Sequence, residues 1–140
     1  MQSVATPVDS IQQTRASLPE RAAIGLVLAL VLNALVRAIT GALVDVSGVD
    51  PLGWGPILTV TIVAAVGATA VYVAVSRFST RPDRHFTIVA AVVLVLSMGP
   101  VFTVAPTIPG VTATMLVALA VLHVTTAVGL VTGLTGVIHR

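Results

Sequence analysis

The chain has 140 residues, of which 56% are hydrophobic and 9% are charged, and its mean hydropathy is +1.08. A soluble domain carries about 25% charged residues, so a water-soluble fold of this composition could not cover its own surface. The seven basic residues are all arginine and form no basic stripe, which argues against a nucleic-acid partner, and the lack of cysteine excludes disulfides and thiolate sites. We therefore expect the lipid bilayer to surround most of the chain.

The first helix is predicted from a capping pattern followed by an apolar run. Residues 1–16 are polar and without period, which predicts a short mobile tail on the cytoplasmic side. Ser17 and Glu20 then form a capping box, with Pro19 in the first turn. We place the first span at about 21–44, because about 20 helical residues cross a ~30 Å hydrocarbon core. Its length and its internal arginine argue against a cleaved signal peptide.

A loop and a second helix follow. Residues 45–55 hold two aspartates, three glycines, a proline and the single tryptophan, Trp54, which predicts a loop at a membrane surface. The second span is placed at about 56–78. The most charged stretch of the chain, residues 79–85, comes next. Its sequence TRPD at 80–83 repeats the hydroxyl, any residue, proline and acid of the first cap, so we expect Thr80 to cap the third span.

The last two spans are placed at about 86–104 and 111–137, separated by an uncharged turn. Gly99-Pro100 is expected to kink the third span or to end it. Residues 17–140 thus form one transmembrane domain. The predicted fold class is all-α, an integral membrane four-helix bundle with up-down-up-down connections.

The positions of the arginines orient the four spans. Positively charged residues in short loops stay on the cytoplasmic side. Six of the seven arginines precede the first span, lie between the second and third, or follow the fourth, and these three regions share one face. Both termini are therefore predicted to be cytoplasmic. Three or five spans would scatter the same charges over both faces.

Four polar side chains within the spans are candidate site residues. Asn33 and Arg37 share a helix face, and the rise per residue places Asn33, Ser97 and His123 near one midplane depth. Histidine at this depth could relay protons or, with Arg37, hold an anion. The alternative is that the layer only forms interhelical hydrogen bonds, while Arg37 extends to the headgroups or pairs with Asp45.

Glycines indicate where helices approach closely. Gly25 and Gly41 lie on the same face as the Asn33 and Arg37 pair, Gly129 and Gly133 form a small-xxx-small pattern, and Gly67 lies near the polar layer. We expect all five to be helix-packing positions. Packing within one chain is the default, and packing against a second copy is the alternative.

Patterns that carry enzyme chemistry are missing from the sequence. There is no metal-ligand spacing, phosphate loop, nucleophile elbow or pair of intramembrane carboxylates. We therefore expect no enzyme activity, cofactor or metal. Two functions stay open: a structural or accessory component, alone or in a homo-oligomer or larger membrane complex, and a small transporter or proton-linked permeation unit. A water-reachable cavity touching Asn33 and His123 would favour transport, and a dry hydrogen-bonded core would favour the accessory role.

The second half of the chain resembles a family that is known only as a domain of unknown function. The residues that carry the resemblance are Arg81 to Thr87, Leu-Ser-Met-Gly-Pro at 96–100, and Leu122-His123-Val124, where the family has methionine in place of Leu122. The resemblance covers about residues 20–138 and is to small four-helix membrane proteins of actinobacteria and haloarchaea. It implies a four-span protein of the prokaryotic plasma membrane with no established activity, and it singles out Ser97, Pro100 and His123.

Overall fold

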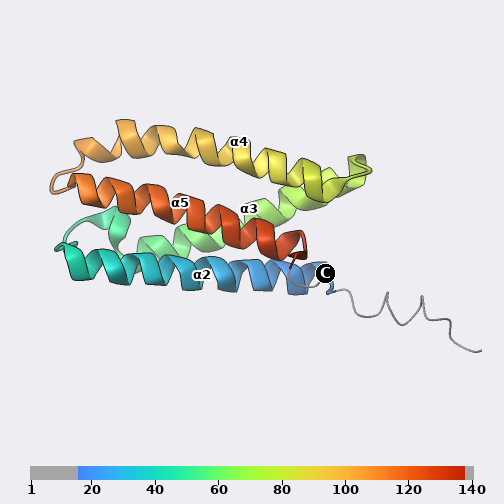
Figure 1. The fold of residues 1–140 in the computed structure, drawn as a ribbon, viewed down its shortest axis with the longest axis horizontal. Coiled ribbons are helices and arrows are strands. Elements are labelled where there is room, and N and C mark those ends of the chain that lie inside the picture. Colours follow the sequence, from blue (N-terminus) through green and yellow to red (C-terminus); the bar gives the residue numbers. More distant parts are fainter. Residues whose placement is uncertain (1–15, 138–140) are drawn as a thin grey trace, which may run out of the picture.

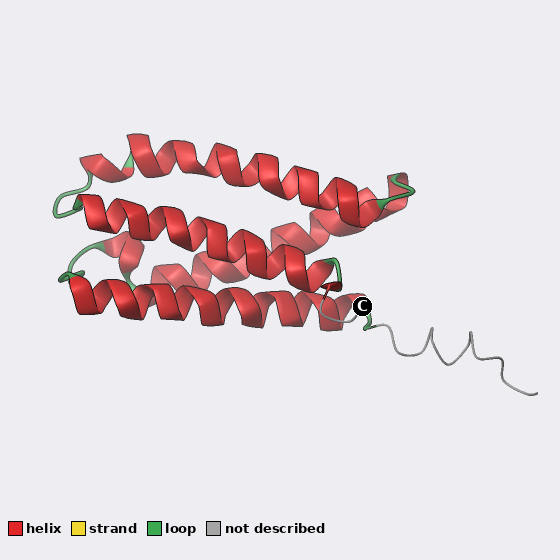
Figure 2. Cartoon of the chain, in the orientation of Figure 1, coloured by secondary structure: helices red, strands yellow, loops and turns green. Residues whose placement is uncertain are grey.

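The computed structural model describes residues 16–137, which form a bundle of four long helices (Figure 1). Short 3₁₀ helices, η1 and η2, lie in the α2–α3 and α4–α5 connections, and the described residues contain no strand (Figure 2). Residues 1–15 of the predicted tail lie outside the described part. The helix bounds are α2 Leu18–Leu43, η1 Asp50–Leu52, α3 Trp54–Phe78, α4 Pro82–Thr103, η2 Ala105–Thr107 and α5 Ala113–Leu134.

Each of the four predicted spans falls on one of these helices. All four helices are long and apolar enough to cross a membrane, by length and composition. Consecutive helices run in opposite directions, so the start of α2 and the end of α5 lie at the same end of the bundle (Figure 1). The predicted all-α four-helix fold is therefore confirmed, together with its up-down-up-down order.

The two predicted helix caps have different outcomes. At the start of α2 the Ser17 backbone amide donates to the Glu20 carboxylate at 3.2 Å, and the Glu20 amide donates to the Ser17 hydroxyl at 3.4 Å, which confirms the capping box. The expected cap at Thr80 is wrong. The N-cap of α4 is Arg81, whose amide donates to the Ser79 hydroxyl at 3.0 Å. That bond forms a turn ahead of Pro82, so the helix begins one residue later than the pattern predicted.

Pro100 lies inside α4 and does not end it. The helix continues to Thr103, and the amide of Val104 donates to the carbonyl of Pro100 at 2.9 Å. Of the two alternatives expected at Gly99-Pro100, a kink or an end of the helix, the end is wrong, and α4 stops within one residue of the predicted limit at about 104. The connection from α4 to α5 includes Gly110, whose φ of +85° is a backbone conformation that glycine adopts without steric cost.

The helices form a ring in the order α2, α5, α4 and α3, and the closest approach is between α2 and α5 (Figure 1). Small residues make that approach possible. A Cβ on Gly133 would lie 2.3 Å from the Cα of Gly25, and a Cβ on Gly129 would lie 2.9 Å from the Cα of Ala29. Both helices therefore meet backbone to backbone, and the small-xxx-small pattern of α5 is used within the chain.

The apolar core is concentrated toward the two ends of the bundle. The largest cluster includes Val46, Val49 and Leu52 of the α2–α3 connection, packed against α3, α5 and the end of α4. The opposite end is filled by Tyr72, Phe86 and Leu134. The middle holds only the small cluster of Ala29, Ala65 and Leu130. Because the middle is filled mainly by small residues, the bundle leaves space there between its helices.

Candidate functional site

Asn33 is the centre of a hydrogen-bonded cluster that joins three helices. Its Nδ2 donates to the Thr61 hydroxyl of α3 at 2.9 Å and to the Thr126 hydroxyl of α5 at 2.8 Å. Its Oδ1 accepts from the Thr125 hydroxyl of α5 at 2.6 Å. The side chain is 2% exposed. We call these four residues the Asn33 cluster.

The orientation of the Asn33 amide follows from its partners. Thr61 and Thr126 each donate their hydroxyl proton to a carbonyl of their own helix, at 2.6 and 2.7 Å, so toward Asn33 they can only accept. The amide nitrogen must therefore face these two hydroxyls, and the amide oxygen faces Thr125. Both amide hydrogens and the amide oxygen are thus paired, so a buried polar group that would be costly alone is satisfied.

Ser97 and His123 do not join the Asn33 cluster. The Ser97 hydroxyl donates to the carbonyl of Leu94 in its own helix at 2.7 Å. The Nδ1 of His123 lies 2.7 Å from the carbonyl oxygen of Leu119, one turn earlier in α5. The predicted midplane layer is therefore not one hydrogen-bonded group, and the threonines that do pair with Asn33 were missed.

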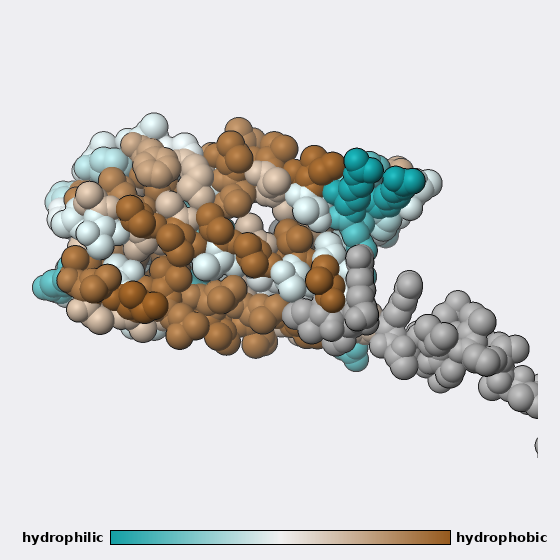
Figure 3. All heavy atoms as spheres, in the orientation of Figure 1, coloured by the Kyte–Doolittle hydropathy of each residue, from teal (hydrophilic) through white to brown (hydrophobic). Residues whose placement is uncertain are grey.

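The same polar residues do line a common cavity. It lies between α3, α4 and α5, has a volume of about 640 Å³, and is bordered by Asn33, Ser97 and His123 together with Thr61 and Thr126. The other lining residues are glycine, alanine, proline, larger aliphatic residues and Phe86. An opening between α4 and α5 is visible on one face of the molecule (Figure 3). The structure thus brings the predicted residues together as a wall and not as a bonded network.

Arg37 lies away from this cavity, at the end of the bundle that carries η1. Its Nε donates to the carbonyl of Leu52, and its guanidinium carbon lies 5.3 Å from the centroid of the Trp54 ring. We call these three residues the Trp54 cluster. Arg37 therefore binds the α2–α3 connection, and the suggested contribution to a midplane anion site is not seen.

Asp45 lies in the α2–α3 connection and binds Ser47, two residues further along the chain. Its carboxylate accepts from the Ser47 amide at 2.9 Å and from the Ser47 hydroxyl at 2.6 Å. These two hydrogen bonds favour the charged form and hold the pKa of Asp45 below its ordinary value. The sequence suggested Asp45 as a partner of Arg37, and the structure pairs it with Ser47 instead.

Two of the five predicted packing glycines have other surroundings. A Cβ on Gly41 would lie 2.5 Å from a guanidinium nitrogen of Arg37, so Gly41 makes room for that side chain and not for a helix. A Cβ on Gly67 would meet nothing within 4 Å, because Gly67 lies on the wall of the cavity. The expectation that Gly67 packs against a helix is therefore wrong.

A second arginine–aromatic group, which sequence reasoning missed, lies at the opposite end. The guanidinium of Arg21 lies 5.0 Å from the centroid of the Tyr72 ring and donates to the Tyr72 hydroxyl at 3.3 Å. That hydroxyl donates to the carboxylate of Asp83 at 2.7 Å, and the ring meets Phe86 edge to face at 5.2 Å. This Tyr72 cluster joins α2, α3 and α4.

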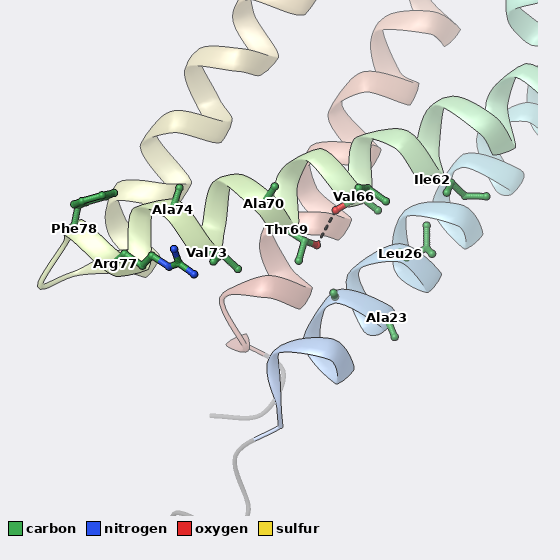
Figure 4. A pocket seen from close by; sticks show the side chains of 12 residues that line it. Ala23, Leu26, Ile62, Val66, Thr69, Ala70, Val73, Ala74, Arg77 and Phe78 are labelled. Carbon is green, nitrogen blue, oxygen red and sulfur yellow. Dashed lines mark hydrogen bonds between the residues drawn. The ribbon is translucent and has the colours of Figure 1, made fainter.

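An open groove of about 690 Å³ runs along the outside of α2 and α3 (Figure 4). Its walls are mainly alanine and valine, with Arg77 at one end and Ile62 toward the other (Figure 4). Among its described lining residues the one hydroxyl, that of Thr69, already donates to the carbonyl of Ala65 at 2.7 Å. The groove therefore offers apolar contact along its length and a cation at one end.

Comparisons with known proteins place the chain in a family but assign no activity. No curated protein and no solved structure matches it. Residues 13–140, which include all four helices and the Asn33, Trp54 and Tyr72 clusters, match the model of one family of unknown function. The expectation of a family without a known activity is thereby confirmed, and the chain belongs to the family of unknown function DUF6069.

Proposed function

We propose that this chain is a multi-pass protein of the prokaryotic plasma membrane that serves as a structural or accessory component and has no enzyme activity. The observation that carries the proposal is the Asn33 cluster. Its amide is buried and paired on all sides by hydroxyls of neighbouring helices, as expected of a polar group that fixes helix register. A group that binds or relays a substrate would keep part of its hydrogen-bonding capacity free.

Membrane insertion is supported by the surface of the helices. Large aliphatic side chains stand outward along the bundle, such as Val95, 71% exposed, and Leu96, 70% exposed. Figure 3 shows hydrophobic residues over much of the middle of the bundle, with hydrophilic residues gathered where α3 meets α4. A soluble monomer rarely exposes a contiguous apolar patch larger than a few hundred Å², whereas lipid covers such a surface without cost.

The orientation is supported by where charges lie. Arg77, Arg81 and Arg84 lie at or beside the α3–α4 connection, at the same end of the bundle as the start of α2 and the end of α5. The opposite end carries Asp45 and Asp50. By the positive-inside rule we infer that the arginine-rich end is cytoplasmic, and that both termini are inside.

Labelling of single cysteines tests the location and the orientation together. The natural chain has no cysteine, so Ser47→Cys and Thr80→Cys each introduce one reactive thiol in an exposed position at opposite ends of the bundle. In intact cells a membrane-impermeant maleimide should label S47C alone, and after permeabilisation it should label both. Labelling of T80C alone would reverse the orientation, and labelling of both in intact cells would contradict membrane insertion.

A small transporter or permeation unit is the second candidate, favoured by the cavity that touches Asn33, Ser97 and His123. The lining counts against a path for ions, since five of its 23 described residues are polar and, of these, only His123 has an ionisable side chain. Arg21 and Arg37 are held in clusters at the two ends of the bundle. A proton path across ~30 Å of hydrocarbon requires a chain of relay groups, which these residues do not provide.

Reconstitution separates the two candidates. Purified protein in liposomes should leave a pH gradient as stable as in empty liposomes, and His123→Ala should change nothing. Dissipation of the gradient by the wild type, lost in a folded H123A variant, would establish the permeation role. The accessory role further predicts that mild detergent extracts a complex larger than a monomer from native membranes. Extraction as a monomer under these conditions would contradict it.

A further inference from the structure

The cavity between α3, α4 and α5 is elongated along the helices. On α3 its lining extends from Pro56 to Val71, about 22 Å at 1.5 Å per residue. Its volume of about 640 Å³ lies within the ~300–1,000 Å³ typical of pockets that hold one small organic molecule. The shape and the mainly aliphatic lining fit a long apolar chain.

The polar atoms of the cavity wall have mostly used their hydrogens already. The hydroxyls of Thr61, Thr126 and Ser97 each donate to a backbone carbonyl of their own helix. Both hydrogens of the Asn33 amide are donated within the Asn33 cluster. What the wall can offer to a ligand is therefore lone pairs, above all on Ser97, whose hydroxyl oxygen accepts no bond from any described residue.

His123 adds a further acceptor. A backbone carbonyl can only accept, so the Nδ1 of His123 must carry the hydrogen that bonds the carbonyl of Leu119. In the neutral ring the hydrogen is then absent from Nε2, which presents a lone pair. Among the described residues Nε2 has no hydrogen-bond partner and is not fully buried, and His123 lines the cavity, so Nε2 is the ring atom left to bind a ligand there.

We propose that this cavity binds one long-chain apolar alcohol, whose hydroxyl donates to His123 Nε2 or to the Ser97 hydroxyl oxygen. The hydrocarbon chain then lies along the aliphatic lining toward Phe86, which is eleven residues, or about 16 Å, from Ser97 along α4. This binding site is distinct from the accessory role and does not depend on it.

The wall also selects against related lipids. No arginine or lysine of residues 16–137 lines the cavity, so a phosphate or carboxylate headgroup would lose its hydration without gaining a counter-charge from them. An ether or ketone of the same length brings only acceptors to a wall that presents acceptors. A hydroxyl is the smallest neutral group that supplies the missing hydrogen.

Photolabelling tests the proposal on the full-length protein in nanodiscs. The probe is hexadecan-1-ol with a diazirine in the middle of its chain, and labelled peptides are located by mass spectrometry. We expect labels on α4 between Phe86 and Ser97 and on α5 between Leu119 and Val131. Unlabelled hexadecan-1-ol should compete roughly fivefold to tenfold better than hexadecyl methyl ether, the difference that one hydrogen bond makes.

Two variants and one control make the test specific. His123→Leu should remove the preference for the alcohol over the ether while labelling of the cavity persists. Ala90→Phe, which fills the cavity and leaves His123 in place, should abolish labelling with either probe. Thr69→Val, in the groove between α2 and α3, should behave as wild type. Unfolding temperatures of all three variants are measured alongside.

Three results would overturn the proposal. Equal competition by the alcohol and the ether would show that the cavity has no preference for a hydroxyl. Stronger competition by hexadecyl phosphate would point to a charged headgroup. Labels confined to the groove between α2 and α3, unaffected by A90F, would show that the probe follows the outer surface and leaves the cavity empty. A90F keeps the test decisive if the His123 variant fails to fold.

Discussion

Gly25 and Gly133 face each other across the α2–α5 contact with no room for a methyl group between them. A Cβ on Gly133 would lie 2.3 Å from both the N and the Cα of Gly25, and 2.8 Å from the carbonyl oxygen of Arg21. All three are backbone atoms of one helix, so relief requires the two helices to separate. Among the glycines of the described part, Gly133 is the one whose added Cβ would lie nearest to backbone atoms of another helix.

Gly133→Ala should destabilise the bundle by roughly 1–3 kcal/mol, the usual cost of overpacking. The matched control is Gly67→Ala in α3, because a Cβ there meets nothing within 4 Å. Alanine is the better helix former by roughly 0.5–1 kcal/mol, so G67A should be neutral or stabilising. Thermal unfolding in detergent followed by circular dichroism checks both. Equal melting temperatures for the two variants would contradict the close contact.

Two substitutions of Asn33 should distinguish the stability lost with all three of its hydrogen bonds from the stability lost when only its amide donor is replaced by an oxygen. Asn33→Leu keeps the volume and removes three interhelical bonds worth ~0.6 kcal/mol each, for a cost of about 1–2 kcal/mol. Asn33→Asp should cost roughly 1–3 kcal/mol more, because its oxygen would face Thr61 and Thr126, whose hydrogens are already donated elsewhere. Unfolding midpoints in detergent show whether the Asp variant is less stable than the Leu variant. An Asp variant as stable as the Leu variant would show that these threonines are free to reorient.

The Trp54 cluster gives a spectroscopic prediction. Trp54 is the only tryptophan, so its fluorescence reports this end of the bundle alone. Arg37→Met removes the bond to the Leu52 carbonyl and the cation beside the ring, so the fluorescence anisotropy of Trp54 should fall. Arg77→Met, at the opposite end, is the control and should leave the anisotropy unchanged. Unchanged anisotropy in R37M would mean that apolar packing of Leu52 is enough to hold the connection.

The hydroxyl and the ring of Tyr72 should make separate contributions to the free energy of unfolding. Tyr72→Phe keeps the edge-to-face contact with Phe86 but removes the bonds to Arg21 and Asp83, for a cost of about 1–3 kcal/mol. The loss of stability in Tyr72→Phe is greater because Arg21 Nε is already buried without a partner among the described residues. Tyr72→Ala should cost more, about 3–5 kcal/mol, since it also leaves a cavity. Unfolding midpoints that coincide for the two variants would assign the whole effect to the ring.

Hydropathy and charge were enough to predict the helices and their order, because both depend on composition along the chain. The Ser17 capping box was predictable for the same reason, since all its atoms lie within four consecutive residues. The cap predicted at Thr80 failed because α4 begins one residue later, with Arg81 as its N-cap. The Ser79 hydroxyl accepts from the Arg81 amide and forms a turn ahead of Pro82, which the hydroxyl, proline and acid pattern does not reveal.

The depth of the candidate site residues along their helices was predictable from the sequence, but the direction in which each helix turns its side chains was not. Asn33, Ser97 and His123 do line one cavity, yet the partners of Asn33 are threonines, which in apolar helices carry no distinguishing pattern. Thr125 and Thr126 lie two and three residues after His123 in α5, so an estimate of depth could have suggested them. Which of these side chains turns toward Asn33 depends on how each helix is rotated against its neighbours, and for α2 and α5 the glycine contacts bring the two backbones together.

The two arginine clusters bear on how the bundle fits the thickness of a membrane. Arg21 and Arg37 are 16 residues apart on α2, or about 24 Å along its axis. The Arg37 guanidinium extends one turn further, because a Cβ on Gly41 would lie 2.5 Å from one of its nitrogens. The two charges are then separated by about 30 Å along α2, close to the ~30 Å of a typical hydrocarbon core. In a bilayer of ordinary thickness both guanidiniums would lie at its two borders, with little hydrophobic mismatch.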